Sequence, residues 1–156
     1  MKKKILIGLL IFVLLFGFVQ FFRPERNWQI NKSRNEIFYK KEADPKIVTM
    51  LKTSCYDCHS NNTAYPWYNN IAPVSWMIAN HVKEGKVKLN FSEWDLYIPE
   101  KQHELLEEII EVVEEGEMPL SSYLIIHSYA KLSTSDKEIL KFWATDKMVE
   151  IENSTK

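Results

Sequence analysis

The chain contains very few cysteines and shows no β pattern. Cys55 and Cys58 are the only two cysteines in 156 residues. A structural zinc site needs four ligands, usually at least two of them cysteines, and here neither a second C-x-x-C nor an H-x-x-x-H is present to complete one. A thioredoxin-like redox pair expects a βαβ context, whereas the chain has no strand pattern and no internal repeat. A simple disulfide or redox pair between the two cysteines remains an alternative.

An excess of basic residues is also lacking over most of the chain. The formal net charge is −1, and residues 1–43 hold nine Lys and Arg against three Asp and Glu. The rest of the chain holds eleven basic and eighteen acidic residues. An acidic domain is a poor nucleic-acid binder, because phosphate neutralisation is the usual source of affinity. We therefore expect no nucleic-acid partner, and one modest domain at this length.

The two cysteines belong to a short motif, Cys55-Tyr56-Asp57-Cys58-His59. The spacing C-x-x-C-H is typical of c-type haem attachment. Two thiols three positions apart can each form a thioether with one of the two vinyl groups on one porphyrin edge. The histidine that follows is then carried under the ring, where an imidazole nitrogen can bind the iron.

The amino terminus predicts a membrane anchor. Lys2, Lys3 and Lys4 precede an apolar run over residues 5–22 in which only Gln20 is polar, just long enough to cross a bilayer as a helix. Bulky residues end the run where a signal peptidase needs small ones, so an uncleaved signal anchor over residues 1–22 is favoured over a cleaved signal peptide. The lysines predict a cytoplasmic amino end.

Thioether attachment in bacteria takes place on the exported side. We therefore expect the protein to be located in the bacterial inner (cytoplasmic) membrane, with the domain facing the periplasm or the outer surface. Residues 23–43 are polar and basic, as expected of a flexible juxtamembrane linker.

The remainder reads as a helical domain over residues 44–148, with a frayed tail over residues 149–156. Asp44-Pro45 is a helix start that leads into Cys55, and Ser133 and Ser135 open capping boxes. Helices are expected over 45–54, over 74–84 with a stop at Gly85, over 99–115 with a stop at Gly116, and from the capping boxes to about residue 148. The predicted fold class is all-α, with four to five helices around a covalent haem.

The loop Gly116-Glu117-Met118-Pro119 offers a candidate for the second iron ligand, Met118. Pro119 holds Met118 out of a helical conformation, in a position to project a thioether at an iron. His127 is the main rival, followed by His81, and an open sixth position is the remaining alternative. A Met ligand would favour the reduced state and raise the potential relative to a second His. A carbonyl near Pro73 is the suggested acceptor for the other ring N–H of His59.

Several motifs resemble one family of bacterial exported proteins, the single-haem "haem-binding domain" family. They lie at residues 55–61, 65–68, 71–76, 89–94, 117–120 and 127–133. The resemblance to this family covers residues 44–147. More broadly, the helix order resembles class I cytochrome c. The resemblance implies one covalent haem c, thioethers at Cys55 and Cys58, and axial ligation by His59 and Met118.

The expected function is a membrane-anchored monohaem c-type cytochrome that carries single electrons to and from unknown redox partner proteins. We expect no enzymatic activity, because no acid–base constellation accompanies the motif. One alternative is a haem-based ligand sensor or weak peroxidase in which Met118 is displaced. Another is a module without haem, held by a disulfide or by zinc.

Overall fold

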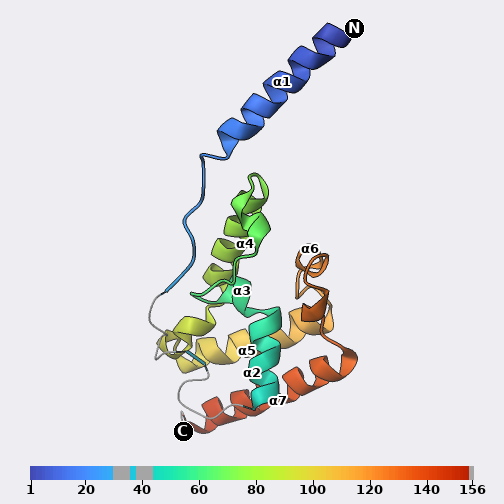
Figure 1. Cartoon of the computed structure of the whole chain (residues 1–156). Coiled ribbons are helices and arrows are strands. Elements are labelled where there is room, and N and C mark those ends of the chain that lie inside the picture. The colour runs from blue at the N-terminus through green and yellow to red at the C-terminus, as the bar shows by residue number, and fades with distance from the viewer. Residues whose placement is uncertain (30–35, 38–43, 155–156) are drawn as a thin grey trace.

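The computed structural model describes residues 1–29, 36–37 and 44–154. In these residues the chain forms seven α-helices and three short 3₁₀ segments, and pairing between extended segments is limited to an isolated bridge between Trp28 and Asn62. The all-α prediction is confirmed. The α-helices (Figure 1) are α1 (Lys2–Val19), α2 (Pro45–Ser54), α3 (Tyr56–His59), α4 (Val74–Lys88), α5 (Pro99–Glu114), α6 (Ser121–Leu124) and α7 (Thr134–Ser154). The 3₁₀ segments are η1 (Trp67–Asn70), η2 (Phe91–Leu96) and η3 (Ser128–Ala130).

The core lies where α5 packs along α7 and α2 crosses both (Figure 1). Apolar residues at helical spacing on each of these helices turn to the same interior. The most deeply buried members of the core are Ile47, Leu51, Phe91, Leu105, Leu106, Leu140 and Ala144. Full burial of each large side chain stabilises the fold by about 1.5–3 kcal/mol, so this cluster is the platform on which the rest is positioned.

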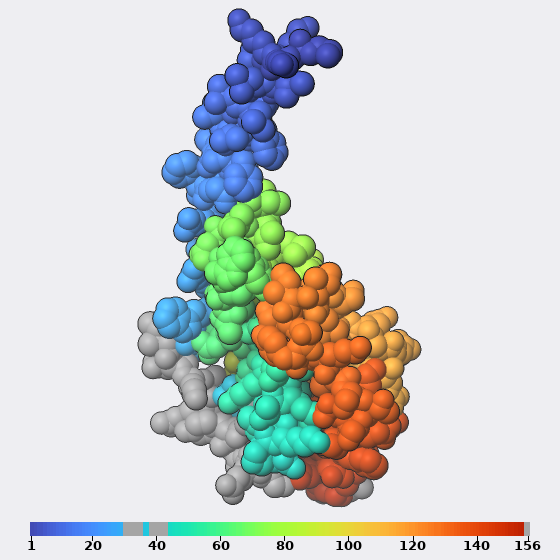
Figure 2. All heavy atoms as spheres, turned by 45° about the vertical axis from the view of Figure 1, so that its right-hand side comes forward, coloured from blue at the N-terminus to red at the C-terminus, as the bar shows by residue number. Residues whose placement is uncertain are grey.

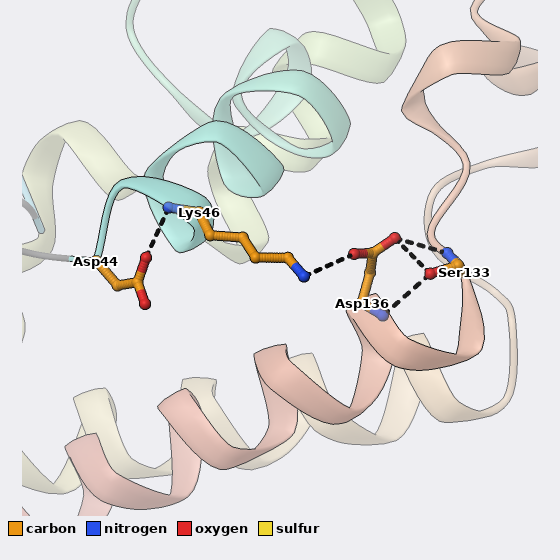
Figure 3. Close-up of polar contacts among 4 residues, drawn as sticks. All are labelled: Asp44, Lys46, Ser133 and Asp136. Atoms are coloured by element: carbon orange, nitrogen blue, oxygen red, sulfur yellow. Dashed lines mark hydrogen bonds and ion pairs between the residues drawn. The ribbon is translucent and has the colours of Figure 1, made fainter.

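The helix ends follow the capping signals of the sequence. Asp44 accepts a hydrogen bond from the backbone N–H of Lys46 at 2.7 Å. At the start of α7, the backbone N–H of Asp136 donates to Ser133 Oγ at 3.2 Å, while the backbone N–H of Ser133 donates to Asp136 Oδ2 at 3.1 Å, a reciprocal capping box. Lys46 Nζ lies 3.8 Å from Asp136 Oδ1 and links the two helix starts (Figure 3). Gly116 ends α5 with a positive φ of 78°, as predicted.

Two helices run further than the sequence indicates. α4 continues through Gly85 to Lys88, although Gly85 was expected to stop it. A Cβ at Gly85 would lie 2.8 Å from the carbonyl oxygen of Cys58, so this glycine serves the close approach of α4 to α3. α7 extends past residue 148 to Ser154, where Ile151 is partly buried against the core.

The prediction of a transmembrane anchor over residues 1–22 is wrong. Among the helices of the described residues, none combines the length and the apolar character that a bilayer crossing requires. α1 has 18 residues, and lysines take its first three positions. The apolar part within the helix, residues 5–19, spans about 22 Å at 1.5 Å per residue, against about 30 Å of hydrocarbon. The expected inner-membrane localisation, which depended on this anchor, is wrong with it.

α1 projects from the helical body, as both views show (Figures 1 and 2). Its carboxyl end is held by Gln20, whose Oε1 accepts from the backbone N–H of Ala72 at 2.8 Å and whose Nε2 donates to the Ala72 carbonyl at 3.2 Å. The indole N–H of Trp76 donates to the carbonyl of Phe22 at 2.6 Å. These contacts join the end of α1 to the start of α4.

Candidate haem site

The motif residues 55–59 lie at the sharp junction between α2 and α3. Cys55 takes φ −126° and ψ −40°, which ends α2, and α3 then forms a single turn. The backbone N–H groups of Cys58 and His59 both donate to the Cys55 carbonyl, at 3.2 and 3.0 Å. Because positions i, i+3 and i+4 lie on one side of a helical turn, the two thiols and the imidazole are presented together. Both cysteines are free thiols.

His59 is held in one tautomer. Its Nδ1 lies 3.1 Å from the carbonyl oxygen of Leu89, and since a carbonyl only accepts, Nδ1 carries the proton and donates. Nε2 is therefore left with its lone pair, as a metal ligand requires. Burial lowers the pKa of His59, which favours the neutral ligand form. The acceptor was expected near Pro73, and that prediction is wrong, because the residue after α4 reaches the ring instead.

Three adjoining pockets surround the motif. The largest, of about 470 Å³, is walled by apolar side chains of α5 and by Phe91, with Cys55, His59 and Met118 at its edge. A second, of about 240 Å³, is lined by Cys55, Cys58, His59 and Met118 together with α4. The third, of about 90 Å³, adjoins Cys58 on the side of α6. Small-molecule and cofactor sites usually occupy apolar concavities of about 300–1,000 Å³.

Met118 enters this hollow from the loop after α5. Its backbone N–H donates to the Val112 carbonyl at 3.0 Å, beside the turn at Gly116. The side chain is half-buried and lines the two larger pockets, as His59 does. The structure therefore brings Met118, 59 positions after His59, to the walls of the same pocket as Cys55, Cys58 and His59.

The two rival histidines differ in what they can offer. Both ring nitrogens of His127 are engaged: Nδ1 lies 3.1 Å from the Tyr123 carbonyl and Nε2 lies 3.0 Å from the Tyr68 hydroxyl. His127 would have to break one of these hydrogen bonds to bind a metal. His81 on α4 is half-buried and lines the same pocket as Cys58 and Met118.

The thiol pKa values weigh against a reactive redox pair, and the arrangement of the side chains weighs against a zinc site. Burial raises the pKa of Cys55 to about 12, and burial together with the charge of Asp57 raises that of Cys58 to about 11. A reactive redox cysteine instead has a lowered pKa, because its thiolate is the nucleophile. No group of three or more His, Cys, Asp or Glu side chains is arranged to hold a metal ion anywhere in residues 1–29, 36–37 and 44–154, so these residues do not form the zinc site considered above.

Part of the predicted linker contacts the loop that follows the motif. Residues 23–29, here named the strap, lie along the loop that follows His59. Asn27 is its centre: its Nδ2 donates to the Ser60 carbonyl at 2.7 Å and to Thr63 Oγ1 at 2.9 Å, and its Oδ1 accepts from Lys86 Nζ at 2.7 Å. The backbone N–H of Asn27 donates to the Tyr65 hydroxyl at 2.8 Å. Residues 30–35 and 38–43 of the predicted linker lie outside the described residues. Ile37, between these two ranges, packs against the core.

Sequence reasoning did not find Asn27, Leu89 or the pair Asp57 and Tyr123 as contributors to this site. Each acts across 30 or more positions of sequence. No local sequence pattern identifies such a partner, because the neighbouring residues of an asparagine or a backbone carbonyl do not show which distant group it will bind.

The residues of the pocket fit a covalently attached haem. They offer two free thiols on one turn, an imidazole with one nitrogen fixed and the other available, a soft thioether, and apolar walls. No curated protein and no solved structure matches the chain, and the resemblance of the fold to class I cytochrome c is therefore not confirmed. A family model described as "Haem-binding domain" matches residues 14–146. The chain belongs to this haem-binding domain family and is a haem-binding protein.

Proposed function

We propose that this protein is a monohaem c-type cytochrome that carries single electrons between redox partner proteins. The haem would be attached through Cys55 and Cys58 and held by His59 and Met118. The observation that supports this most directly is that all four side chains line one pocket, with Nδ1 of His59 already committed to the Leu89 carbonyl. When bound, the haem would supply an iron that gains and loses one electron.

The protein's own residues would then orient the group and shield it. The Leu89 carbonyl fixes the imidazole of His59 and raises its basicity as a ligand. The apolar side chains of α5 and Phe91 line part of the pocket wall and would lower the solvent exposure of a bound haem, which is one of the factors that sets a haem potential. Because His59 and Met118 would both be ligands of the iron, the proposal leaves no ligand position for a substrate, and we propose a carrier and not an enzyme.

The experiment that tests this proposal is production of the full chain together with haem-attachment machinery, followed by intact-mass measurement and visible spectroscopy. We expect the added mass of one haem and a methionine-to-iron absorption band. Cys58→Ala should sharply reduce attached haem, and Cys55→Ala combined with Cys58→Ala should abolish it. His103→Ala is the matched control, because His103 pairs with Glu152 on the surface and its loss should leave attachment unchanged. A colourless wild-type protein would refute the proposal.

A further inference from the structure

One side-chain hydrogen bond joins the two sides of the haem pocket. Tyr123 lies on α6, the helix that directly follows the loop of residues 116–120 carrying Met118. Its hydroxyl donates to Asp57 Oδ2 at 2.8 Å, and Asp57 stands between Cys55 and Cys58. The bond therefore connects the segment that presents the proposed sixth ligand to the segment that presents the thiols and His59.

Asp57 is itself firmly placed. Its Oδ1 accepts from the backbone N–H of Ala64 at 3.0 Å, and its backbone carbonyl accepts from Thr63 Oγ1 at 2.7 Å. With both carboxylate oxygens occupied, the side chain is fixed relative to the motif. A hydrogen bond to a charged group is also worth more than a neutral one, so Asp57 is a strong anchor for the hydroxyl of Tyr123.

Tyr123 is held from the opposite side by His127 and Tyr68. The rings of Tyr123 and His127 stack with centroids 4.0 Å apart and planes 16° from parallel. Because Nδ1 of His127 donates to the Tyr123 carbonyl, Nε2 must accept, and the Tyr68 hydroxyl donates to it at 3.0 Å. Burial, followed by the hydrogen bond to Asp57, raises the pKa of Tyr123, so its hydroxyl keeps the proton that it donates. The four residues form a continuous chain, here named the latch.

Few other contacts hold α6 in place. Of the described elements, only η3 packs closely with α6, and Figure 1 shows α6 standing apart from α3 and α4. η3 in turn packs on α2, where Ser54 Oγ donates to the Ala130 carbonyl at 2.8 Å. Between them lie the pockets of about 240 and 90 Å³, each lined by Cys58 and His81 on one side and Tyr123 on the other. The separation of these walls thus depends on the latch together with the contact between η3 and α2.

We propose that Tyr123 is a positioning residue: through Asp57 it holds the Met118 loop against the motif and so determines how firmly Met118 binds the iron. This inference rests on the proposed function, because it assumes a haem between His59 and Met118. Without the Tyr123 hydroxyl, the loop separates from the motif more easily and an added ligand can compete for the sixth position.

The test is Tyr123→Phe in the haem-loaded full chain, with imidazole as the competing ligand. The phenyl ring keeps the stack on His127. It loses the hydroxyl's bond to Asp57 at 2.8 Å and its longer contact with the Thr53 carbonyl at 3.5 Å. We expect imidazole to bind about tenfold more tightly than to wild type, equivalent to about 1.4 kcal/mol, with a weaker methionine-to-iron band and a lower potential. Tyr129→Phe is the matched control, since Tyr129 also contacts the His127 ring but is 69% exposed.

A second variant guards against misfolding of the first. Tyr68→Phe removes the hydroxyl at the far end of the latch and should raise imidazole affinity in the same direction by a smaller factor. The inference is overturned if wild type has normal haem content and a normal methionine band, yet Tyr123→Phe binds imidazole no more tightly than Tyr129→Phe. If Tyr123→Phe does not fold, the same comparison is made with Tyr68→Phe. A wild-type protein without haem overturns the proposed function and, with it, this inference. Haem without a methionine band overturns the axial role of Met118 and this inference, while attachment at the cysteines stands.

Discussion

Gly85→Ala tests the packing of α4 on the proposed haem-attachment motif. The glycine is buried inside α4, and an added Cβ would lie 2.8 Å from the Cys58 carbonyl oxygen and 3.2 Å from its carbon and Cβ. Ordinary contact begins at 3.4 Å, so the two backbones would have to separate by about 0.6 Å, the difference between these distances. Overpacking of this kind costs about 1–3 kcal/mol, whereas alanine gains about 1 kcal/mol over glycine in a helix.

The net expectation for Gly85→Ala is a loss of about 1 kcal/mol in the free energy of unfolding, within the range of about 0–2 kcal/mol that these opposing effects allow. The yield of covalent haem should also fall, because the displaced backbone is that of Cys58. Urea unfolding followed by circular dichroism measures the first effect and intact mass the second. Gly17→Ala is the control, since a Cβ there would meet nothing within 4 Å and should cause no loss. A Gly85→Ala chain as stable as wild type with normal haem yield would refute the packing role of this glycine.

Three further predictions concern other parts of the molecule. Met118→Ala should lower the reduction potential in a redox titration while the haem stays attached; an unchanged potential would transfer the sixth position to a histidine. Ser133→Ala should cost about 1 kcal/mol in urea unfolding through loss of the cap. Hydrogen bonds from Ser133 hold the pKa of Asp136 below its usual range, so this contribution is present above about pH 4 and lost as the pH falls through the lowered pKa; a variant with the same acid sensitivity as wild type would contradict this. Asn27→Ala should cost about 1–3 kcal/mol by leaving its partners unpaired, and equal stability of Asn27→Ala and wild type would show that the strap contributes nothing.

The features that the sequence predicted correctly are local. The Asp44 cap, the Ser133 capping box and the stop at Gly116 each depend on residues within four positions, where backbone geometry alone decides the outcome. The motif at residues 55–59 is equally compact, and the structure places its two thiols and imidazole on one turn; haem attachment at this motif stays a prediction. All the residues that such a signal needs lie within one short segment, so it can be identified from the sequence.

The features that the sequence did not predict arise from packing between distant segments. A glycine at position 85 predicts a helix stop, but in the structure it lies inside α4 and allows the close approach of α4 to Cys58. The apolar run over residues 5–22 is long enough to predict a membrane span, whereas the helix ends at Val19 and lysines take its first three positions. The acceptor for His59 comes from Leu89, and the partner of Asp57 from Tyr123, 66 positions away. Neither pairing has a sequence signature, because backbone carbonyls and tyrosines occur throughout the chain.

The strap has a practical consequence for anyone who shortens this protein. Residue 44 is the natural place to cut, judged from sequence, yet a chain that started there would lack the amide of Asn27. The Ser60 carbonyl and the ammonium group of Lys86 would each lose a partner, and the loop that follows His59 would lose its hydrogen bonds to Asn27. A minimal version of the protein therefore has to begin before residue 23, even though the thiols come more than thirty positions later.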